Sequence, residues 1–318
     1  MSYLLLSGGL VMLIFGSNWL VDGASSLARK LKISDIVIGL TVVAFGTSSP
    51  ELVVNLIASF KGNTDIAIGN ILGSNIFNIL AILGITSLFL PVTVKNNTVW
   101  KEIPFSILAI LIVAIIANDV LIDGYEKNVI SRVDGLVLLG FFSIFMAYTF
   151  ILAKQSGPLM EVEKISMSIP KSVMFIIVGL AGLFFGGRFL VMGAVEIALR
   201  FGMTESVIGL TVVAAGTSLP ELATSITAAL KKNSDIAIGN VVGSNIFNVF
   251  FILGASAVIR PLPFSINSNV DVIVAFIAGL LMFLFVFTGK GRKISRLEGT
   301  IFLFLYVVYT VYLVGYSN

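Results

Sequence analysis

Residues 38–52 read IGLTVVAFGTSSPEL, and residues 208–222 read IGLTVVAAGTSLPEL. A second segment recurs in the same way, because KGNTDIAIGNILGSNIFN at 61–78 returns as KKNSDIAIGNVVGSNIFN at 231–248. The offset is 170 residues in both cases. The matching positions include Gly, Pro, Glu, Ser, Asn and Asp, which chance similarity between apolar segments does not supply. The chain is therefore an internal duplication.

The composition is that of an integral membrane protein. Of the 318 residues, 57% are hydrophobic and 12% are charged, and the mean hydropathy is +1.05, whereas soluble domains carry about 25% charged residues. The absence of Cys and His argues against disulfides and against a zinc or copper site. We attribute the net charge of +3 to basic loops at a membrane surface and expect no binding to nucleic acid. The first apolar segment has no basic n-region, so we expect a retained helix rather than a signal peptide.

Hydropathy predicts an all-α fold of about ten membrane-spanning helices, since about 20 apolar residues cross the hydrocarbon. The expected spans are 3–28, 36–60, 66–90, 104–122, 133–153, 171–199, 206–230, 236–259, 270–288 and 297–315. Each repeat holds an odd number of spans, so the second repeat enters the membrane from the opposite side and the two halves are inverted copies. We expect repeats over 1–153 and 171–318, joined by a short linker at 154–170 that leaves no room for a regulatory domain.

The basic residues indicate the orientation in the membrane. When the loops are assigned to alternating sides, 14 of the 20 Lys and Arg residues lie on one side and five on the other, with Arg188 inside a span. The positive-inside rule places the basic side in the cytoplasm. Both termini are then predicted to be extracellular.

The segment GTSSPE interrupts an apolar span and predicts a broken helix. Proline disfavours a helical residue before it, whereas hydroxyl side chains suit helix N-caps and proline suits the first helical turn. One half-helix should end near Ala44 to Gly46, and a second should start near Ser48 to Pro50. Irregular backbone at this depth is tolerated only where it is buried in protein or lines a cavity. Glu51 would lie in the first turn of the second half-helix, with Thr47 and Ser48 on the same side.

The second motif obeys the same logic. Its small residues permit close helix contact, and Ser74 and Asn78 are four residues apart on one face. The second repeat supplies the corresponding residues Thr217, Ser218, Glu221, Ser244 and Asn248. Because inverted repeats are related by a two-fold axis in the membrane plane, both sets should converge near the midplane.

The predicted site offers only oxygen ligands. They comprise two carboxylates, several hydroxyls, two amide oxygens and backbone carbonyls freed at the helix breaks, for which Ala44 and Ala214 are candidates. Oxygen ligands suit hard cations, and Ca²⁺ takes about 6–8 of them. One Ca²⁺, two Na⁺ or two protons would each neutralise the two carboxylates. Since an empty, doubly charged site is costly in a membrane, we expect the protein to change its exposed side only when loaded, which is antiport.

The two GTS-x-PE motifs, each followed by GN-x-x-GSNIFN in a five-helix repeat, closely resemble the sodium/calcium exchanger family of the calcium/cation antiporters. The resemblance covers essentially the whole chain. It implies a ten-helix protein of the prokaryotic type in the cell membrane, with Ca²⁺ and Na⁺ as transported ions, no cofactor and no enzymatic activity. It also implies that the first and sixth helices slide as a pair, while the second, third, seventh and eighth enclose the ions.

Carried over residue by residue, the resemblance implies that Glu51 and Glu221 are the central Ca²⁺ ligands. It places around them Thr47, Ser48, Ser74, Thr217, Ser218, Ser244, the carbonyls of Ala44 and Ala214, and Asn78 and Asn248. Several family members have Asp where this chain has Asn248, so the central charge here is −2 rather than −3. This difference leaves the counter-ion open between Na⁺, H⁺ and a K⁺-dependent mode.

Two other classes of function fit the sequence less well. A cation channel usually builds its pore from repeated subunits, whereas these acids lie inside one inverted-repeat unit that can work as a monomer. An intramembrane hydrolase would need a base beside its serine, but the chain has no His and no Lys lies centrally in a span. The sequence leaves the roles of Asp22, Arg188 and Glu196 open, with Arg188 a candidate partner for either acid.

Overall fold

The computed structural model describes residues 1–155, 167–201, 214–288 and 291–316, and helices dominate all four ranges. Several long helices contain π-helical turns, denoted η. The elements of the first half are α1 (Ser2–Leu31), α2 (Asp35–Ile38), η1 (Gly39–Val43), α3 (Ala44–Thr47), α4 (Ser49–Lys61), α5 (Thr64–Ile76), η2 (Phe77–Leu83), α6 (Gly84–Phe89), β1 (Val92–Thr93), η3 (Thr98–Glu102), α7 (Ile103–Ile116), α8 (Asp119–Ile122), β2 (Val129–Ile130) and α9 (Arg132–Gln155).

The second half repeats this order. Its described elements are α10 (Ile169–Arg200), α12 (Ala214–Gly216), α13 (Leu219–Leu230), α14 (Ser234–Ile246), η5 (Phe247–Leu253), α15 (Gly254–Ile259), β3 (Leu262–Pro263), the 3₁₀ turn η6 (Ile266–Ser268), α16 (Asn269–Thr288), β4 (Lys293–Ile294) and α17 (Arg296–Tyr316).

The described residues contain eight helices long and apolar enough to cross a membrane, and nine if the pair Asp35–Thr47 and Ser49–Lys61 is one bent span. The expected all-α membrane fold is thus confirmed. The predicted span 206–230 begins outside the described residues, as does most of the linker 154–170. The predicted span 104–122 is shifted toward the C-terminus. The observed helix runs from Thr98 to Ile116 and is followed by the separate α8. The long helix ends next to Asn118, whose side chain donates to the Ala114 carbonyl and pairs with Asn269.

The helices that carry the second motif form the centre of the bundle. The span of α14, η5 and α15 is 94% buried, and the span of α5, η2 and α6 is 78% buried, whereas the outer spans are at most 39% buried. A helix that is buried all round can be apolar on every face, but these two also carry buried Ser and Asn side chains. The polar residues of the duplicated motif are therefore in the most enclosed part of the protein.

Contacts at both ends of the bundle are reciprocal between the halves. Strand β1 pairs with β4 and strand β2 pairs with β3, both antiparallel. The Arg132 side chain donates to the Val258 carbonyl, and the Arg296 side chain donates to the Leu88 carbonyl. Each of these contacts is thus matched by a counterpart, which is the pattern that a two-fold relation between the halves produces.

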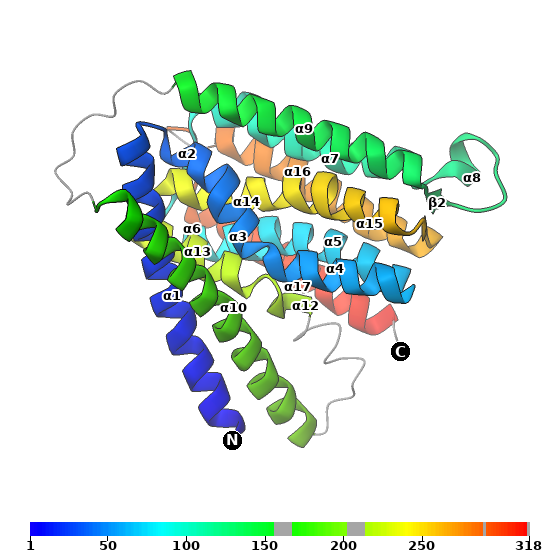
Figure 1. Cartoon of the computed structure of the whole chain (residues 1–318). Helices are drawn as coiled ribbons and strands as arrows, with labels where there is room; N and C mark the ends of the chain where they lie inside the picture. The colour runs from blue at the N-terminus through cyan, green and yellow to red at the C-terminus, as the bar shows by residue number, and fades with distance from the viewer. Residues whose placement is uncertain (156–166, 202–213, 289–290, 317–318) are drawn as a thin grey trace.

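Helices α1 and α10 lie side by side and cross the rest of the bundle obliquely (Figure 1). Glycines allow their backbones to touch. A Cβ atom on Gly9 would meet the Gly186 carbonyl oxygen at 2.6 Å, and one on Gly16 would meet the backbone of Leu183 at 2.8 Å. Close backbone approach at small residues is typical of membrane helix pairs.

We expect Gly9→Ala to lower the melting temperature of the purified protein by several degrees, because overpacking costs about 1–3 kcal/mol. The matched control is Gly8→Ala on the same helix, where a new Cβ has nothing within 4 Å. Since Ala favours a helix over Gly by about 1 kcal/mol, the control should keep or raise the melting temperature. Equal melting temperatures for both variants would contradict the close packing of α1 against α10.

Candidate ion-binding site

The two GTS-x-PE segments form sharp breaks between half-helices. Helix α3 ends at Thr47, Ser48 has φ −80° and ψ 8°, and α4 starts at Ser49 with Pro50 in its first turn. The two half-helices meet at 48°. Ser218 has φ −89° and ψ 8° at the corresponding break before α13. Glu51 and Glu221 therefore lie in the first turns of α4 and α13, where the helix dipole favours a negative charge.

Each glutamate is held by a serine from the other repeat. The Ser48 hydroxyl lies 2.8 Å from Glu221 Oε1 and 2.9 Å from Ser244 Oγ. Reciprocally, the Ser218 hydroxyl lies 3.0 Å from Glu51 Oε1 and 3.3 Å from Ser74 Oγ. Both carboxylates are only 1% exposed, and they are close enough for their charges to repel each other. The breaks thus bring two buried negative charges together inside the protein.

Four asparagines from α5–η2 and α14–η5 form a second reciprocal set. Asn78 Nδ2 donates to Asn245 Oδ1 at 2.9 Å, and Asn248 Nδ2 donates to Asn75 Oδ1 at 3.0 Å. Asn78 and Asn248 each lie near the start of a π-helical segment, and such segments are frequent at functional sites. Because these bonds use the amide nitrogens, they leave the amide oxygens of Asn78 and Asn248 free to accept.

Among the described residues, five oxygens of the predicted site have no hydrogen-bond partner. They are Oε2 of Glu51 and Glu221, Oδ1 of Asn78 and Asn248, and Oγ1 of Thr217, which lies near the Glu51 carboxylate without a hydrogen bond of normal geometry. Buried polar groups normally have partners, and leaving them without one is costly. The described residues contain no group of three or more His, Cys, Asp or Glu side chains. The charge at this site is therefore that of two carboxylates, surrounded by neutral oxygens that suit a hard cation.

The backbone at the first break differs from the prediction. The Ala44 carbonyl is not freed, because it accepts from the Ser48 amide at 3.0 Å and lies 3.3 Å from the Thr47 hydroxyl. The reason is that α3 stays helical up to Thr47, so the last i to i−4 bond forms before the break at Ser48. Ala44 can still ligate through its second lone pair. Ala214 is the first residue of α12, at the edge of the described range.

The two repeats differ at their threonines. Thr47 Oγ1 lies 3.0 Å from Asn240 Oδ1 and also near the Val43 carbonyl, whereas Thr217 Oγ1 has no partner within the described residues. Thr217 and Ser74 line a cavity of about 380 Å³, whose described lining also includes Asp271 and Tyr309. Tyr309 donates to Asp271 at 2.8 Å. One side of the candidate site is thus closed by Asn240, while the other is next to a cavity.

Sequence reasoning missed the supporting role of two further asparagines. Asn240 donates to the Glu221 carbonyl at 3.2 Å and to Ser225 at 3.0 Å, and Asn70 lies 3.5 Å from the Glu51 carbonyl and 2.6 Å from Asn55. These hydrogen bonds join α4, which carries Glu51, to α5, and α13, which carries Glu221, to α14. Their presence in both copies of the GN-x-x-GSN motif was the available signal.

The profile of the family described as sodium/calcium exchanger protein matches residues 1–151 and 171–315. The chain belongs to the sodium/calcium exchanger family. This is a family of transporters rather than enzymes, and its members are exchangers of cations including Ca²⁺.

Several relatives of this exchanger match over nearly their whole length. It is 40% identical to the putative antiporter CaxA of Alkalimonas amylolytica, covering 95% of each chain. It is 30% identical to the sodium/calcium exchanger MaX1 of Methanosarcina acetivorans, covering 98% of each chain. Among solved structures, the sodium-calcium exchanger NCX_Mj matches with a TM-score of 0.83 and 36% identity, covering 98% of each chain. The exchanger is therefore a multi-pass membrane protein of the prokaryotic type.

The three charged residues that the sequence left open lie outside this site of the exchanger. Asp22 pairs with Lys231 at 2.7 Å, and Glu196 pairs with Arg200 one helical turn away at 2.6 Å. Arg188, the candidate partner that the sequence left open, forms an ion pair with neither acid among the described residues. Arg188 instead lines a cavity beside Thr217 and Pro220.

Proposed function

We propose that this exchanger moves Ca²⁺ across the membrane in exchange for Na⁺, and that both ions bind in turn at the site between Glu51 and Glu221. The observation that carries the proposal is the set of buried oxygens without partners on these glutamates, on Asn78 and Asn248 and on Thr217. Ser48, Ser74, Ser218 and Ser244 complete the coordination, with Thr47 and the carbonyls of Ala44 and Ala214 at its edges.

The charge of the site supports exchange rather than one-way transport. One Ca²⁺ neutralises the two carboxylates, and monovalent cations in the same cage do so as well. An empty site would bury two negative charges at close range in a membrane, where unpaired charge is costly. Loaded states are therefore the ones that can alternate between the two sides, and each ion must be replaced by the other.

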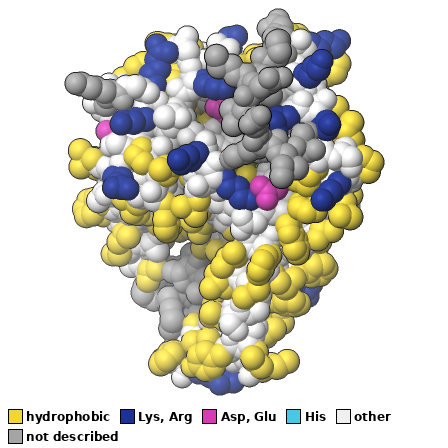
Figure 2. Space-filling view, turned by 90° about the vertical axis from the view of Figure 1, so that its left-hand side faces the viewer, with side chains coloured by type: hydrophobic (Ala, Val, Ile, Leu, Met, Phe, Trp, Pro, Cys, Tyr) yellow, Lys and Arg dark blue, Asp and Glu magenta, His cyan; other side chains and the backbone are white. Residues whose placement is uncertain are grey.

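The surface charge supports a cytoplasmic position for one end of the bundle. Figure 2 shows the face on which α9 ends and α10 begins in Figure 1, and Lys and Arg side chains are spread over its upper part. Two basic residues of this side also form ion pairs, Lys95 with Asp235 and Lys231 with Asp22. By the positive-inside rule this face is cytoplasmic, which would place both chain termini outside. The site inside a single chain fits a functional monomer.

The direct test is Ca²⁺ uptake by proteoliposomes that contain the purified protein. Vesicles loaded with Na⁺ and diluted into Na⁺-free medium should accumulate radiolabelled Ca²⁺, whereas vesicles with only a pH gradient or only a K⁺ gradient should not. Uptake driven equally well by the pH gradient would instead support Ca²⁺/H⁺ exchange, in which protons neutralise Glu51 and Glu221. Ca²⁺ flux without any exchangeable counter-ion would contradict antiport and favour a channel.

The cavity beside Ser74 and Thr217 leads to a prediction for ion entry. Asp271 lines this cavity, and a carboxylate in a cleft raises the local concentration of cations. We expect Asp271→Asn to raise the KM for Ca²⁺ by about 2–5-fold at low ionic strength, with an unchanged maximal rate. The difference should shrink in high salt, because screening weakens steering.

The matched control for this prediction is Asp123→Asn in the exposed loop after α8. It removes the same charge from a residue that does not line the cavity, so its KM should equal that of the wild type. A KM for Asp271→Asn that does not respond to ionic strength would show that Asp271 does not steer cations.

A further inference from the structure

Glu102 is a buried acid that the ion site does not use. It is 1% exposed and ends η3, where it meets Tyr148 of α9. The residue at the same position of the second repeat is Val272. Glu102 therefore lies outside the ion site, although the neighbouring Asp271 of the second repeat makes a similar contact with Tyr309. A buried ionisable residue in a membrane protein is costly and generally serves a function.

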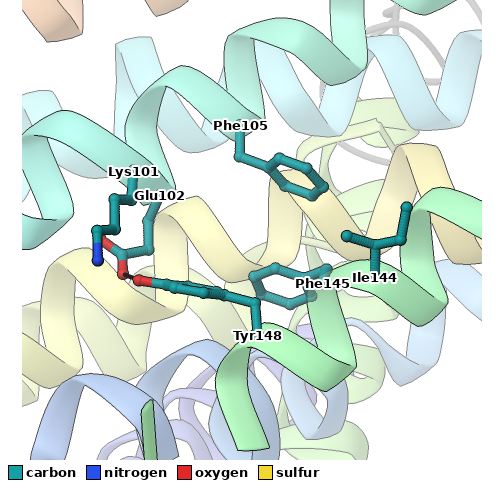
Figure 3. A pocket seen from close by; sticks show the side chains of 6 residues that line it. All are labelled: Lys101, Glu102, Phe105, Ile144, Phe145 and Tyr148. Carbon is teal, nitrogen blue, oxygen red and sulfur yellow. Dashed lines mark hydrogen bonds between the residues drawn. The ribbon is translucent and has the colours of Figure 1, made fainter. Parts of the chain in front are cut away.

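The carboxylate of Glu102 is only half satisfied. Tyr148 donates its hydroxyl proton to Oε1, whereas Oε2 has no hydrogen-bond partner. Lys101 does not fill this role, because within the described residues no Lys or Arg side chain forms an ion pair with Glu102. The Lys101 ammonium instead lies 5.7 Å from the centre of the Tyr148 ring. Figure 3 shows these three side chains gathered at one end of a pocket.

The other end of this pocket is apolar. Its volume is about 320 Å³, and Phe105, Ile144 and Phe145 complete its lining. In Figure 3 these three side chains lie farther along the pocket from Lys101 and Glu102. Ile144 is 59% exposed on the outer face of α9, so the pocket is open toward the surface that meets lipid. Lys101 and Lys154 both lie toward the basic end of the bundle, which puts the polar end near the level of the lipid headgroups.

We infer that this pocket binds a phospholipid whose headgroup carries a primary ammonium. The ammonium would donate to Glu102 Oε2 and lie against the Tyr148 ring, which attracts cations. The neighbouring Lys101 would bind the phosphate, and an acyl chain would occupy the apolar end among Phe105, Ile144 and Phe145. This inference does not rest on which ions the protein transports.

The charge pattern selects this headgroup over the common alternatives. An anionic headgroup satisfies Lys101 but brings no cation to the buried Glu102. A trimethylated ammonium brings charge but no N–H group, so Oε2 remains without a donor. A primary ammonium joined to a phosphate satisfies Glu102 and Lys101 together. Selectivity between these lipids is thus the property that distinguishes the pocket from ordinary lipid contact.

The inference can be tested by native mass spectrometry of the full chain, released from detergent with defined lipids. Equal amounts of phosphatidylethanolamine, its N-trimethylated analogue phosphatidylcholine, and phosphatidylglycerol are added to the wild type. We expect a bound phosphatidylethanolamine that survives activation, with at least about tenfold preference over the other two, since a hydrogen bond to a charged group is worth about 1.5–3 kcal/mol. Equal retention of all three lipids, or a preference for phosphatidylglycerol, would overturn the inference.

Two variants and one matched control show which side chains give the pocket its preference for phosphatidylethanolamine. Glu102→Gln should abolish the preference for phosphatidylethanolamine, whereas Glu126→Gln, in the exposed loop before β2, should keep it. Tyr148→Phe keeps the ring and removes only a hydroxyl that bonds Glu102 rather than the lipid, so it should reduce the preference by only about threefold. Unchanged selectivity in Glu102→Gln would refute the site. If that variant does not fold, the lipid panel on the wild type still decides. Loss of lipid selectivity with normal Ca²⁺ exchange would leave the proposed function intact.

Discussion

Replacing Glu51 or Glu221 by Gln is expected to reduce Na⁺-driven Ca²⁺ uptake at least about 100-fold, which corresponds to about 2.7 kcal/mol. Each substitution removes half of the negative charge that holds the divalent cation. Gln has the same shape and can still accept from Ser218 or Ser48, so the serine contacts across the repeats should persist. The measurement is the initial rate of radiolabelled Ca²⁺ uptake into proteoliposomes with matched protein content.

The control for both substitutions is Glu196→Gln, which alters a surface pair with Arg200. It should transport at the rate of the wild type. The melting temperatures of the Glu51 and Glu221 variants should be equal to or above that of the wild type, because two buried carboxylates repel each other. Wild-type uptake by either variant would remove that glutamate from the site.

Substituting Asn248 by Asp is expected to tighten Ca²⁺ binding and to slow exchange. The site then holds three negative charges, so a bound Ca²⁺ is attracted more strongly, and we expect about a tenfold lower KM, equivalent to about 1.4 kcal/mol. The loaded site also keeps one uncompensated charge, which is costly to move through the membrane. The maximal rate of Ca²⁺/Ca²⁺ exchange should therefore fall, as measured by labelled efflux into Ca²⁺-containing medium.

The matched control is Asn267→Asp, which adds the same charge at an exposed position of η6. Its KM and maximal rate should remain those of the wild type. An unchanged KM in Asn248→Asp would show that the Asn248 side chain does not face the bound Ca²⁺.

The sequence predicted the parts of the site that local chemistry determines. Pro50 and Pro220 forced breaks after Thr47 and near Ser218, and the duplicated motif indicated which helices would meet. The buried Glu51 and Glu221 lie where those breaks place them. Such features follow from backbone rules that act within a few residues.

Features that depend on packing between distant segments were not predictable in this way. The Ala44 carbonyl kept its helical partner because α3 continues to Thr47, and no sequence pattern distinguishes that from a break a few residues earlier. The contrast between Thr47, which is held by Asn240, and Thr217, which has no partner, breaks a symmetry that the sequence repeats almost perfectly. The burial of Glu102 was also not predictable, because its partner Tyr148 lies 46 residues away on another helix.

The central claim is that Ca²⁺ and Na⁺ compete for one site between Glu51 and Glu221. Equilibrium binding of radiolabelled Ca²⁺ to the purified protein, with NaCl or choline chloride added at constant ionic strength, tests it most directly. We predict that Na⁺ but not choline displaces Ca²⁺ competitively, and that the Glu51→Gln/Glu221→Gln double variant retains no specific Ca²⁺ binding. Ca²⁺ binding that is insensitive to Na⁺, or that survives in the double variant, would contradict the account.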